Sequence, residues 1–539
     1  MIKLLTRIIY FSLFFGALLK SFQYSAETLN INFTTIHLLV FLFSFMIIVN
    51  TIKFSLYFIM QIEENKINDI LYFMCLPFFT LYFQPQIHQY FKNYFKFDSS
   101  AIKYHFYFVI FTALLILFGN LLLIIYKNRE KLNNSKSADK IYKYYLLLFL
   151  ILIYGFLMIT SQIHGIHGDE INHIWLADSL KNDFDVNLIN NTPQNQYFLI
   201  AHYFFKNNNS QVYTSVMPGT ALFSMPLYFL LKTLGIRIFI FICSIILAVF
   251  LYNYLIYKNI KPFFAFIAIL VSLSLHPINV YSSQIYPELI AALLSLLTII
   301  FFEKTKPIFS ALFCALLIYF HIKYIALIGL LIAIILFFYR STPQKNKFVF
   351  LIFLAIFSIP FELYIFNIYN SFNPFSPYIF GSDSAPYSFF QLLKLNVLSN
   401  NFFKQLYLNL FDLQFGLFIN NPLYLFIFFA IITISLKNPK KYGHFLILIF
   451  GYTFYLFLNN QNYNGYSPFN RLLTPILPFS AVFFAEYLQS LTNKKIKILL
   501  IAGFIISFTI SSIFILLPIS RYPNFYGYNS IYNLIRNKK

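Results

Sequence analysis

Charged residues are scarce in this chain of 539 residues, because only 11% of them are Asp, Glu, Lys or Arg. Soluble proteins carry about 25% charged residues, so the composition excludes a soluble domain. Apolar runs of about 17 to 25 residues recur from end to end, and each is long enough to cross a bilayer as a helix. Such runs are too long and uninterrupted for the strands of a membrane barrel. The sequence therefore predicts an all-α polytopic membrane protein.

Cysteine is also rare, and the three that occur, Cys75, Cys243 and Cys314, all lie inside apolar runs. This placement excludes a disulfide framework and a CxxC metal site. A Gly-rich phosphate loop after a strand pattern is missing as well, which argues against a bound nucleotide. The sequence therefore requires no cofactor.

Acidic residues are the rarer charged type, with 18 Asp and Glu against 39 Lys and Arg, and the formal net charge is +21. The basic residues cluster in short loops between the apolar runs, where they orient the spans and meet anionic lipid headgroups. No basic face with interleaved aromatic residues occurs outside the runs, so we expect no nucleic-acid partner. The expected partner is the lipid bilayer.

Basic loops are expected on the cytoplasmic side, and the apolar runs between them then number about 15 spans. We predict a four-span N-terminal extension at 1–127, a basic cytoplasmic linker at 128–141, a membrane body at 142–520 and a C-terminal tail at 521–539. The spans of the body are expected near 142–160, 238–257, 262–281, 285–302, 307–320, 323–339, 347–369, 418–436, 442–459, 472–490 and 497–517.

The longest polar segment, 161–217, follows the first span of the body and is therefore expected on the extracytoplasmic side. Loops of this length are usually functional or disordered. The next apolar run, 218–234, is interrupted by Pro218, Gly219 and Pro226, which favours a juxtamembrane helix over a span.

Acidic and basic side chains gather on the extracytoplasmic face of this predicted body, where charges close to a bilayer usually mark function. The candidates are Asp169, Glu170, His173 and Trp175 in the long loop, and Glu288, Lys323 and Arg471 further along the chain. A carboxylate can act as a general base, while Lys and Arg can neutralise a phosphate. This mixture suits an enzyme that handles an anionic lipid headgroup.

Each candidate also has a plainer interpretation. Asp169 and Glu170 are equally typical of a helix N-terminus, and Glu288 could cap the helix that begins there. Lys323 could extend its amino group to the membrane interface, and Arg471 could be an ordinary loop charge. The residues alone leave these alternatives open.

Metal binding is a further alternative in the long loop. His164 and His167 could hold a divalent cation together with Asp169, although no motif fixes the geometry. The Asp183-x-Asp185 pair is more typical of a turn than of a metal site.

One family shares several of these stretches. Gly168 to Asp185, followed by Asn190-Asn191, resembles the first extracytoplasmic loop of bacterial integral-membrane glycosyltransferases with the type-C fold, enzymes similar to protein mannosyltransferases and lipid A aminoarabinose transferases. Further stretches that resemble family elements are Tyr213 to Tyr228 (the Pro-Gly juxtamembrane helix), Ser282 to Leu289 (the second acidic loop), Phe411 to Pro422 (the Gly-Leu-x-x-x-x-Pro stretch) and Asn464 to Pro478 (the late Gly-x-Arg element). The resemblance covers residues 140–520.

This resemblance implies transfer of a hexosyl or pentosyl sugar from a polyprenyl-phosphate donor to a lipid, glycan or protein acceptor. The reaction would occur at the extracytoplasmic face of a bacterial inner membrane. Asp169 would be the general base, with Glu170 and Glu288 as supporting catalytic groups. Lys323 and Arg471 would contact the donor phosphate.

The chain departs from the family's pattern in two places. Ile322 stands where the family has Thr before the lysine, and the family's Trp-rich, Gly-Gly approach to the late arginine is reduced to Asn464-Gly465-Tyr466. His173 and Trp175 are additional candidates for substrate binding.

Other functional classes remain open. A transporter or flippase of lipid-linked saccharides would show discontinuous helices, paired charges near the midplane and internal repeats. The sequence has no convincing repeat, and its acids gather at one face. A polysaccharide ligase or polymerase would place its large loop late in the chain. A catalytically silent relative in envelope glycan assembly would keep the fold without the reaction.

Overall fold

The computed structural model describes part of the chain, which divides into two units, Met1–Ile141 and Tyr142–Lys539. The described residues are 137–163, 166, 168–188, 204–206, 211–214, 216–340, 342–376, 401–412, 416–458 and 470–516, with the single positions 125, 128, 130 and 132. The predicted four-span extension and the predicted C-terminal tail lie almost wholly outside these residues.

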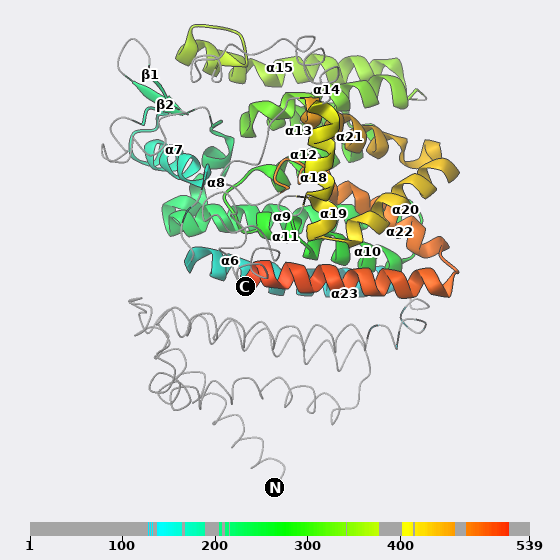
Figure 1. Ribbon diagram of the computed structural model, residues 1–539. Helices are drawn as coiled ribbons and strands as arrows, with labels where there is room; N and C mark the ends of the chain where they lie inside the picture. The colour runs from blue at the N-terminus through cyan, green and yellow to red at the C-terminus, as the bar shows by residue number, and fades with distance from the viewer. Residues whose placement is uncertain are drawn as a thin grey trace, which may run out of the picture. The chain divides into compact units, whose positions relative to one another are not determined.

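The described part of the body is mostly helical (Figure 1). Its first helices are α6 (Ala138–Ile163), α7 (Glu170–Asn182), α8 (Gly219–Leu231), α9 (Thr233–Tyr257), α10 (Pro262–Ser274), α11 (Ile278–Tyr281), α12 (Glu288–Glu303) and α13 (Pro307–Phe320). They are followed by η4 (Ile322–Tyr324), α14 (Ile325–Ala333), η5 (Ile334–Phe338), α15 (Gln344–Tyr369), α18 (Asn401–Phe411), α19 (Leu417–Asn420), α20 (Leu423–Lys437), α21 (Pro439–Leu458), η6 (Leu477–Phe479), α22 (Ser480–Ser490) and α23 (Lys494–Leu516).

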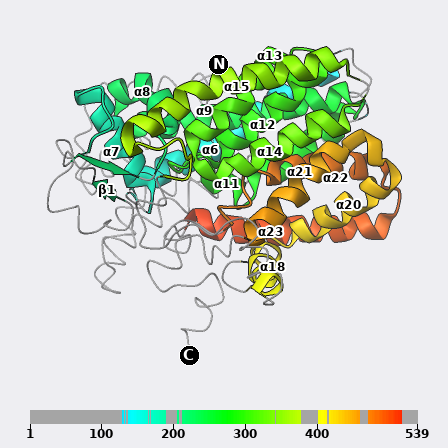
Figure 2. The same cartoon turned by 90° about the horizontal axis from the view of Figure 1, so that it is seen from above.

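One short β-ribbon departs from the predicted all-α fold. Strands β1 (Phe204–Lys206) and β2 (Val212–Thr214) pair antiparallel, with Phe204 opposite Thr214. The ribbon falls inside the segment 161–217, which was predicted as a long loop. Figures 1 and 2 show the ribbon, α7 and α8 together at one end of the body.

Every predicted span of the body overlaps a helix or a group of helices. Among the described residues, four helical segments are long and apolar enough to cross a membrane: Ala138–Met158, Thr233–Tyr257, Gln344–Tyr369 and Lys494–Ser512. The number of spans stays a prediction. The predicted span 262–281 is instead divided into α10 and α11, because Pro277 has no N–H to continue a helix. The predicted span 323–339 consists of η4, α14 and the π-helical η5.

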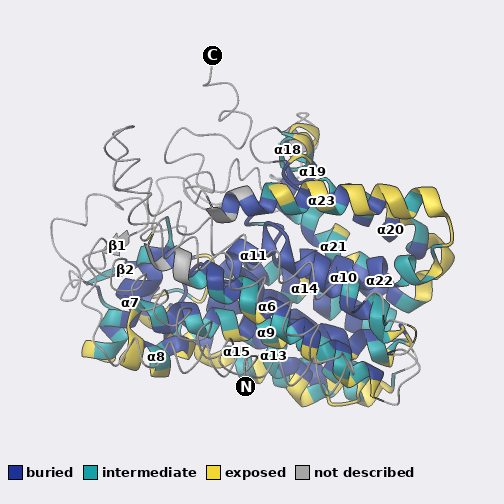
Figure 3. Cartoon of the chain, turned by 90° about the horizontal axis from the view of Figure 1, so that it is seen from below, coloured by how far each residue is buried: buried dark blue, intermediate teal, exposed yellow. Residues whose placement is uncertain are grey.

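Helix α12 forms the centre of the packed region. It is buried along almost its whole length and packs against α9 and α13. Helices α15 and α23 lie at the outside and expose large apolar side chains, among them Phe348, Ile356, Ile501 and Ile505 (Figure 3). Exposed apolar surface of this kind is what a lipid bilayer covers.

Helices α8 and α9 form a close-packed pair that positions the end of the body carrying α7. Only Lys232, with a positive φ of 50°, separates the two helices. A Cβ atom on Gly235 would lie 2.1 Å from the carbonyl oxygen of Leu227, so only glycine permits this approach. The helix predicted at 218–234 is present as α8, and its place beside the membrane stays a prediction.

Gly235→Ala should destabilise the protein, because the new methyl group collides with the backbone of α8. Overpacking of this kind costs about 1–3 kcal/mol, so the melting temperature in detergent should fall by several degrees. Gly155→Ala in α6 is the matched control, since a Cβ there meets nothing within 4 Å. Equal melting temperatures for the two variants would contradict the close packing of α8 on α9.

Candidate functional site

The site begins at the start of α7, where Asp169 occupies the N-cap position. Asp169 and Glu170 thus lie at a helix N-terminus, as the plainer interpretation expected, but the Asp169 side chain makes no capping hydrogen bond to the helix. Its Oδ2 atom instead accepts a hydrogen bond from Nη1 of Arg471, which lies 302 residues further along the chain. The side chain of Asp169 is 30% exposed, so this carboxylate remains accessible.

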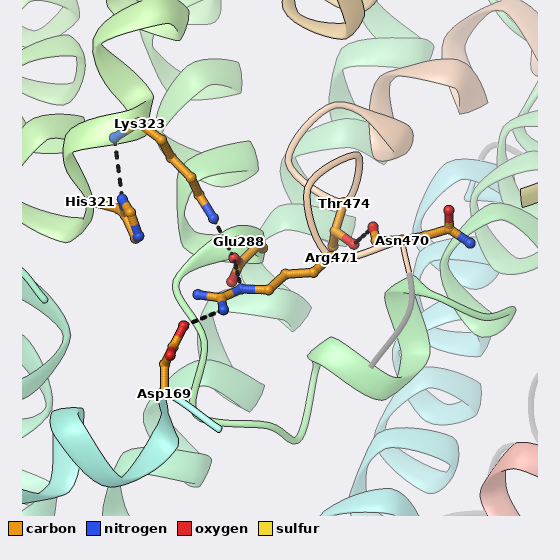
Figure 4. A network of polar contacts seen from close by, with 7 residues as sticks. All are labelled: Asp169, Glu288, His321, Lys323, Asn470, Arg471 and Thr474. Carbon is orange, nitrogen blue, oxygen red and sulfur yellow. Dashed lines mark hydrogen bonds and ion pairs between the residues drawn. The ribbon is translucent and has the colours of Figure 1, made fainter. Parts of the chain in front are cut away.

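Glu288 is the centre of the charged network and is the first residue of α12. Its Oε1 atom accepts hydrogen bonds from Lys323 Nζ at 2.7 Å and from Arg471 Nε at 2.7 Å (Figure 4). The Glu288 side chain is fully buried, and those of Lys323 and Arg471 are each 8% exposed. Among the described residues its other oxygen, Oε2, has no hydrogen-bond partner.

Asp169, Glu288, Lys323 and Arg471 are called the charge cluster below. Two carboxylates and two cations leave it without net charge, which is how buried ionic groups are usually tolerated. The guanidinium carbon of Arg471 also lies 4.3 Å from the ring centre of Tyr286, a cation–π contact.

Local structure fixes each cation of the cluster. Lys323 lies in the short helix η4, and its backbone N–H donates to Nδ1 of His321 at 3.2 Å. Arg471 lies in a turn that follows Asn470, whose φ is 58°. The Thr474 hydroxyl donates to the carbonyl oxygen of Asn470 at 2.9 Å and closes that turn. Neither cation is therefore free to take many positions.

The pKa of Asp169 reports the balance of these forces. Burial alone would raise it, but the positive charge and the hydrogen bond of Arg471 outweigh burial, and the pKa lies below its ordinary value. Asp169 is therefore ionised at neutral pH. It can accept a proton only weakly while Arg471 is bound to it.

Glu170 belongs to a second buried ion pair. Its Oε1 lies 3.5 Å from Nη2 of Arg237 and accepts a hydrogen bond of 2.7 Å from the backbone N–H of Ile285. Arg237 in turn donates to the carbonyl oxygen of Ser283 at 2.8 Å. Together they hold the 283–285 loop that leads to Glu288. The contacts of Glu170 therefore hold this loop, and the supporting catalytic role predicted for Glu170 stays a prediction.

Arg237 was not among the sequence candidates. It lies near the start of α9 and is almost completely buried. A signal was present, because a lone arginine inside an apolar run is costly unless a carboxylate pairs with it. The identity of its partner, Glu170, could not be predicted, because the two residues are 67 positions apart in the chain.

His173 lies one helical turn after Asp169 and is 1% exposed. Among the described residues neither ring nitrogen has a hydrogen-bond partner. Burial lowers the pKa of His173 to about 4, so the ring is neutral at physiological pH. Trp175 is 5% exposed and lies in the packed interior, which leaves little of its ring for a substrate.

The remaining candidates in the long loop fall into two groups. His164 and His167 lie outside the described residues, so the metal hypothesis is untested there. Within the described ranges no three His, Cys, Asp or Glu side chains are grouped as metal ligands. Asp185 Oδ1 accepts hydrogen bonds from Ser179 Oγ at 2.7 Å and from the backbone N–H of Asn187 at 3.0 Å, which is turn chemistry as expected.

The chain matches no known protein-family model and no curated protein. A functional proposal therefore rests on the geometry of the charge cluster and on the short motifs quoted above.

His173 should make the folded protein sensitive to mild acid. Its pKa is about 4 in the folded protein and ordinarily 6.5, so between these values the unfolded chain binds a proton that the folded one excludes. The free energy of unfolding should thus fall by about 3 kcal/mol from pH 6.5 to pH 4 on this account. The lowered pKa of Asp169 acts only at pH below its ordinary 3.8, outside this window.

The measurement is denaturant unfolding in detergent at pH 7.0 and 4.5, for wild type and His173→Gln. The variant should lose less stability on acidification, because glutamine binds no proton. An identical loss in both proteins would show that His173 does not carry this pH dependence.

Proposed function

We propose that this protein is a membrane glycosyltransferase of the type-C fold that transfers a sugar from a polyprenyl-phosphate donor to an acceptor. One observation carries the proposal. Four charged side chains from separate stretches of sequence meet in one hydrogen-bonded cluster: Asp169, Glu288, Lys323 and Arg471. A base beside two cations is the set of groups that this transfer needs.

The proposed reaction breaks the bond between the sugar's anomeric carbon and the phosphate oxygen. An acceptor hydroxyl forms the new bond to that carbon, and its proton passes to Asp169. The bonding electrons leave with the lipid phosphate, whose negative charge Lys323 and Arg471 stabilise. Because the phosphate is a good leaving group, positioning and electrostatic stabilisation supply most of the catalysis.

Arg471 has two functions in this proposal. Without a donor it pairs with Asp169 and lowers that residue's pKa, so the base is weak. A bound phosphate would draw the guanidinium away from Asp169 and place a second negative charge nearby. Both changes raise the pKa of Asp169, so the base gains strength only once the donor is present.

Glu288 keeps the cations in place during this exchange. It is bonded to Lys323 and to Nε of Arg471, which leaves the outer nitrogens of Arg471 to change partner. The Glu170–Arg237 pair bonds the backbone of the 283–285 loop, which leads to Glu288, and so helps to hold Glu288 in position. Glu170 would then act on the rate through position rather than through contact with substrate.

The proposal places the site at the extracytoplasmic face of a bacterial inner membrane, within a fold of about 15 spans. Basic loops support this orientation, since Lys258 and Lys304 follow the C-terminal ends of α9 and α12. These ends lie away from the charge cluster, which is at the N-terminal end of α12. The charge cluster lies at the N-terminal end of α12 and not at its middle. This placement favours an enzyme over a transporter with a binding site at the bilayer midplane.

Asp169→Asn should abolish sugar transfer while the protein remains folded. Loss of a general base costs about 100-fold or more, and the neutral amide keeps the size of the side chain. Purified protein in proteoliposomes would be supplied in turn with labelled polyprenyl-phosphate hexoses and pentoses together with a membrane extract as acceptor. The release of free polyprenyl phosphate is the readout.

Asp183→Asn is the matched control, because Asp183 is exposed, lies in the same segment and is separate from the charge cluster. It should keep wild-type activity. Undiminished transfer by Asp169→Asn would remove Asp169 from the mechanism, and an inactive wild type with every donor would refute the proposed function.

A further inference from the structure

Tyr286 is the aromatic residue that the guanidinium of Arg471 contacts. It is fully buried and precedes Glu288 by two residues. The guanidinium carbon of Arg471 lies over the Tyr286 ring, 4.3 Å from the ring centre. Tyr286 also meets Tyr281 in an edge contact, with 5.7 Å between ring centres and the ring planes inclined by 72°. The ring is therefore held in the interior and can fix the position of the cation that lies over it.

Two kinds of contact hold Arg471 at the same time. Its Nε donates to Oε1 of Glu288 at 2.7 Å, and its Nη1 donates to Oδ2 of Asp169 (Figure 4). The contact with the Tyr286 ring coexists with both hydrogen bonds. A planar guanidinium donates hydrogen bonds from its edges and can present a face to an aromatic ring. The ring contact therefore leaves the N–H groups to anionic partners.

We infer that Tyr286 is a positioning residue that holds the Arg471 guanidinium in place while it passes from Asp169 to the phosphate of the lipid-linked donor. The inference rests on the proposed function and names a residue that acts on the donor through Arg471. A further carboxylate at this position would compete with the phosphate for the same N–H groups. A neutral ring attracts the cation without that competition.

The backbone beside Tyr286 is fixed by the second ion pair, Glu170 with Arg237. Glu170 Oε1 accepts a hydrogen bond of 2.7 Å from the backbone N–H of Ile285, the residue directly before Tyr286. The ring is thus a fixed support on which the long side chain of Arg471 is ordered before the donor arrives. An arginine that is already ordered spares ligand binding the entropic cost of ordering it.

The alternative is that Tyr286 only fills space in its loop. Two substitutions address this alternative. Tyr286→Met supplies a flexible apolar side chain that adapts to irregular space but has no π face. Tyr286→Phe keeps the ring and removes only the hydroxyl, so the cation–π contact is retained.

The reaction of arginine side chains with phenylglyoxal tests the hold on Arg471 without any donor. The full-length protein in nanodiscs of neutral lipid is modified, and mass spectrometry follows the rate at each arginine. Arg471 should react several-fold faster in Tyr286→Met than in wild type, because its guanidinium has lost one contact. Tyr286→Phe should react at the wild-type rate.

Arg237 is the internal control for this measurement, because it donates to the carbonyl oxygen of Ser283 in the same loop at 2.8 Å. Its rate should be the same in Tyr286→Met and in wild type. Equal acceleration of Arg237 and Arg471 would show that Tyr286 only supports the loop, and it would overturn the inference.

The affinity for a sugar-free polyprenyl monophosphate tests the effect on the donor. Calorimetry in the same nanodiscs gives the dissociation constant, and the corresponding polyprenol without phosphate is the ligand control. Tyr286→Met should bind the monophosphate about fivefold more weakly than wild type, the loss expected when one long side chain must be ordered on binding. Tyr286→Phe should bind it as tightly as wild type, since a phenyl ring supports the same contact.

The outcomes separate the two claims. A wild type that binds the monophosphate no better than the polyprenol would overturn the proposed function itself. If the wild type binds the monophosphate, then wild-type affinity in Tyr286→Met, or an equal loss of affinity in Tyr286→Phe, overturns the inference about Tyr286 alone.

Discussion

The structure depends on one buried oxygen atom, Oε1 of Glu288, which accepts hydrogen bonds from both Lys323 and Arg471. This atom joins the start of α12 to η4 and to the turn before η6. Through Arg471 the connection reaches Asp169 at the start of α7. Buried charges are tolerated only when they are paired, and removal of one partner leaves the others uncompensated. The constraint therefore fixes four segments of the chain, distant in sequence, to one place at one end of the helical body.

In the proposed mechanism the same constraint links donor binding to catalysis. Arg471 holds Asp169 as a weak base, and a phosphate is the natural competitor for its guanidinium. Donor binding would thus prepare the base, and an acceptor that arrives first would find it weak. The second ion pair, Glu170 with Arg237, stabilises the loop on which Glu288 depends and leaves the first pair free to change. In the proposed mechanism the Glu170–Arg237 pair stays intact, while the Asp169–Arg471 pair opens when the donor binds.

Sequence patterns predicted much of this because charge is so rare in the chain. Length and apolarity located the helices of the body. The rarity of charge drew attention to the extracytoplasmic face, and the resemblance to type-C glycosyltransferases selected Asp169, Glu288, Lys323 and Arg471 there. Pairing could not be predicted, because nothing local indicates that Arg471 contacts Asp169 across 302 residues. The β-ribbon was missed because its strands are three residues long, too short for a period to show.

The most direct test of the account is the affinity of the ligand-free protein for a polyprenyl monophosphate, compared between wild type and Asp169→Asn. The substitution removes one negative charge from a neutral cluster and releases Nη1 of Arg471. If Arg471 passes from Asp169 to the phosphate, the catalytically dead variant should bind the monophosphate several-fold more tightly than wild type, while Asp183→Asn remains unchanged. Equal or weaker binding by Asp169→Asn would contradict the exchange on which the mechanism depends.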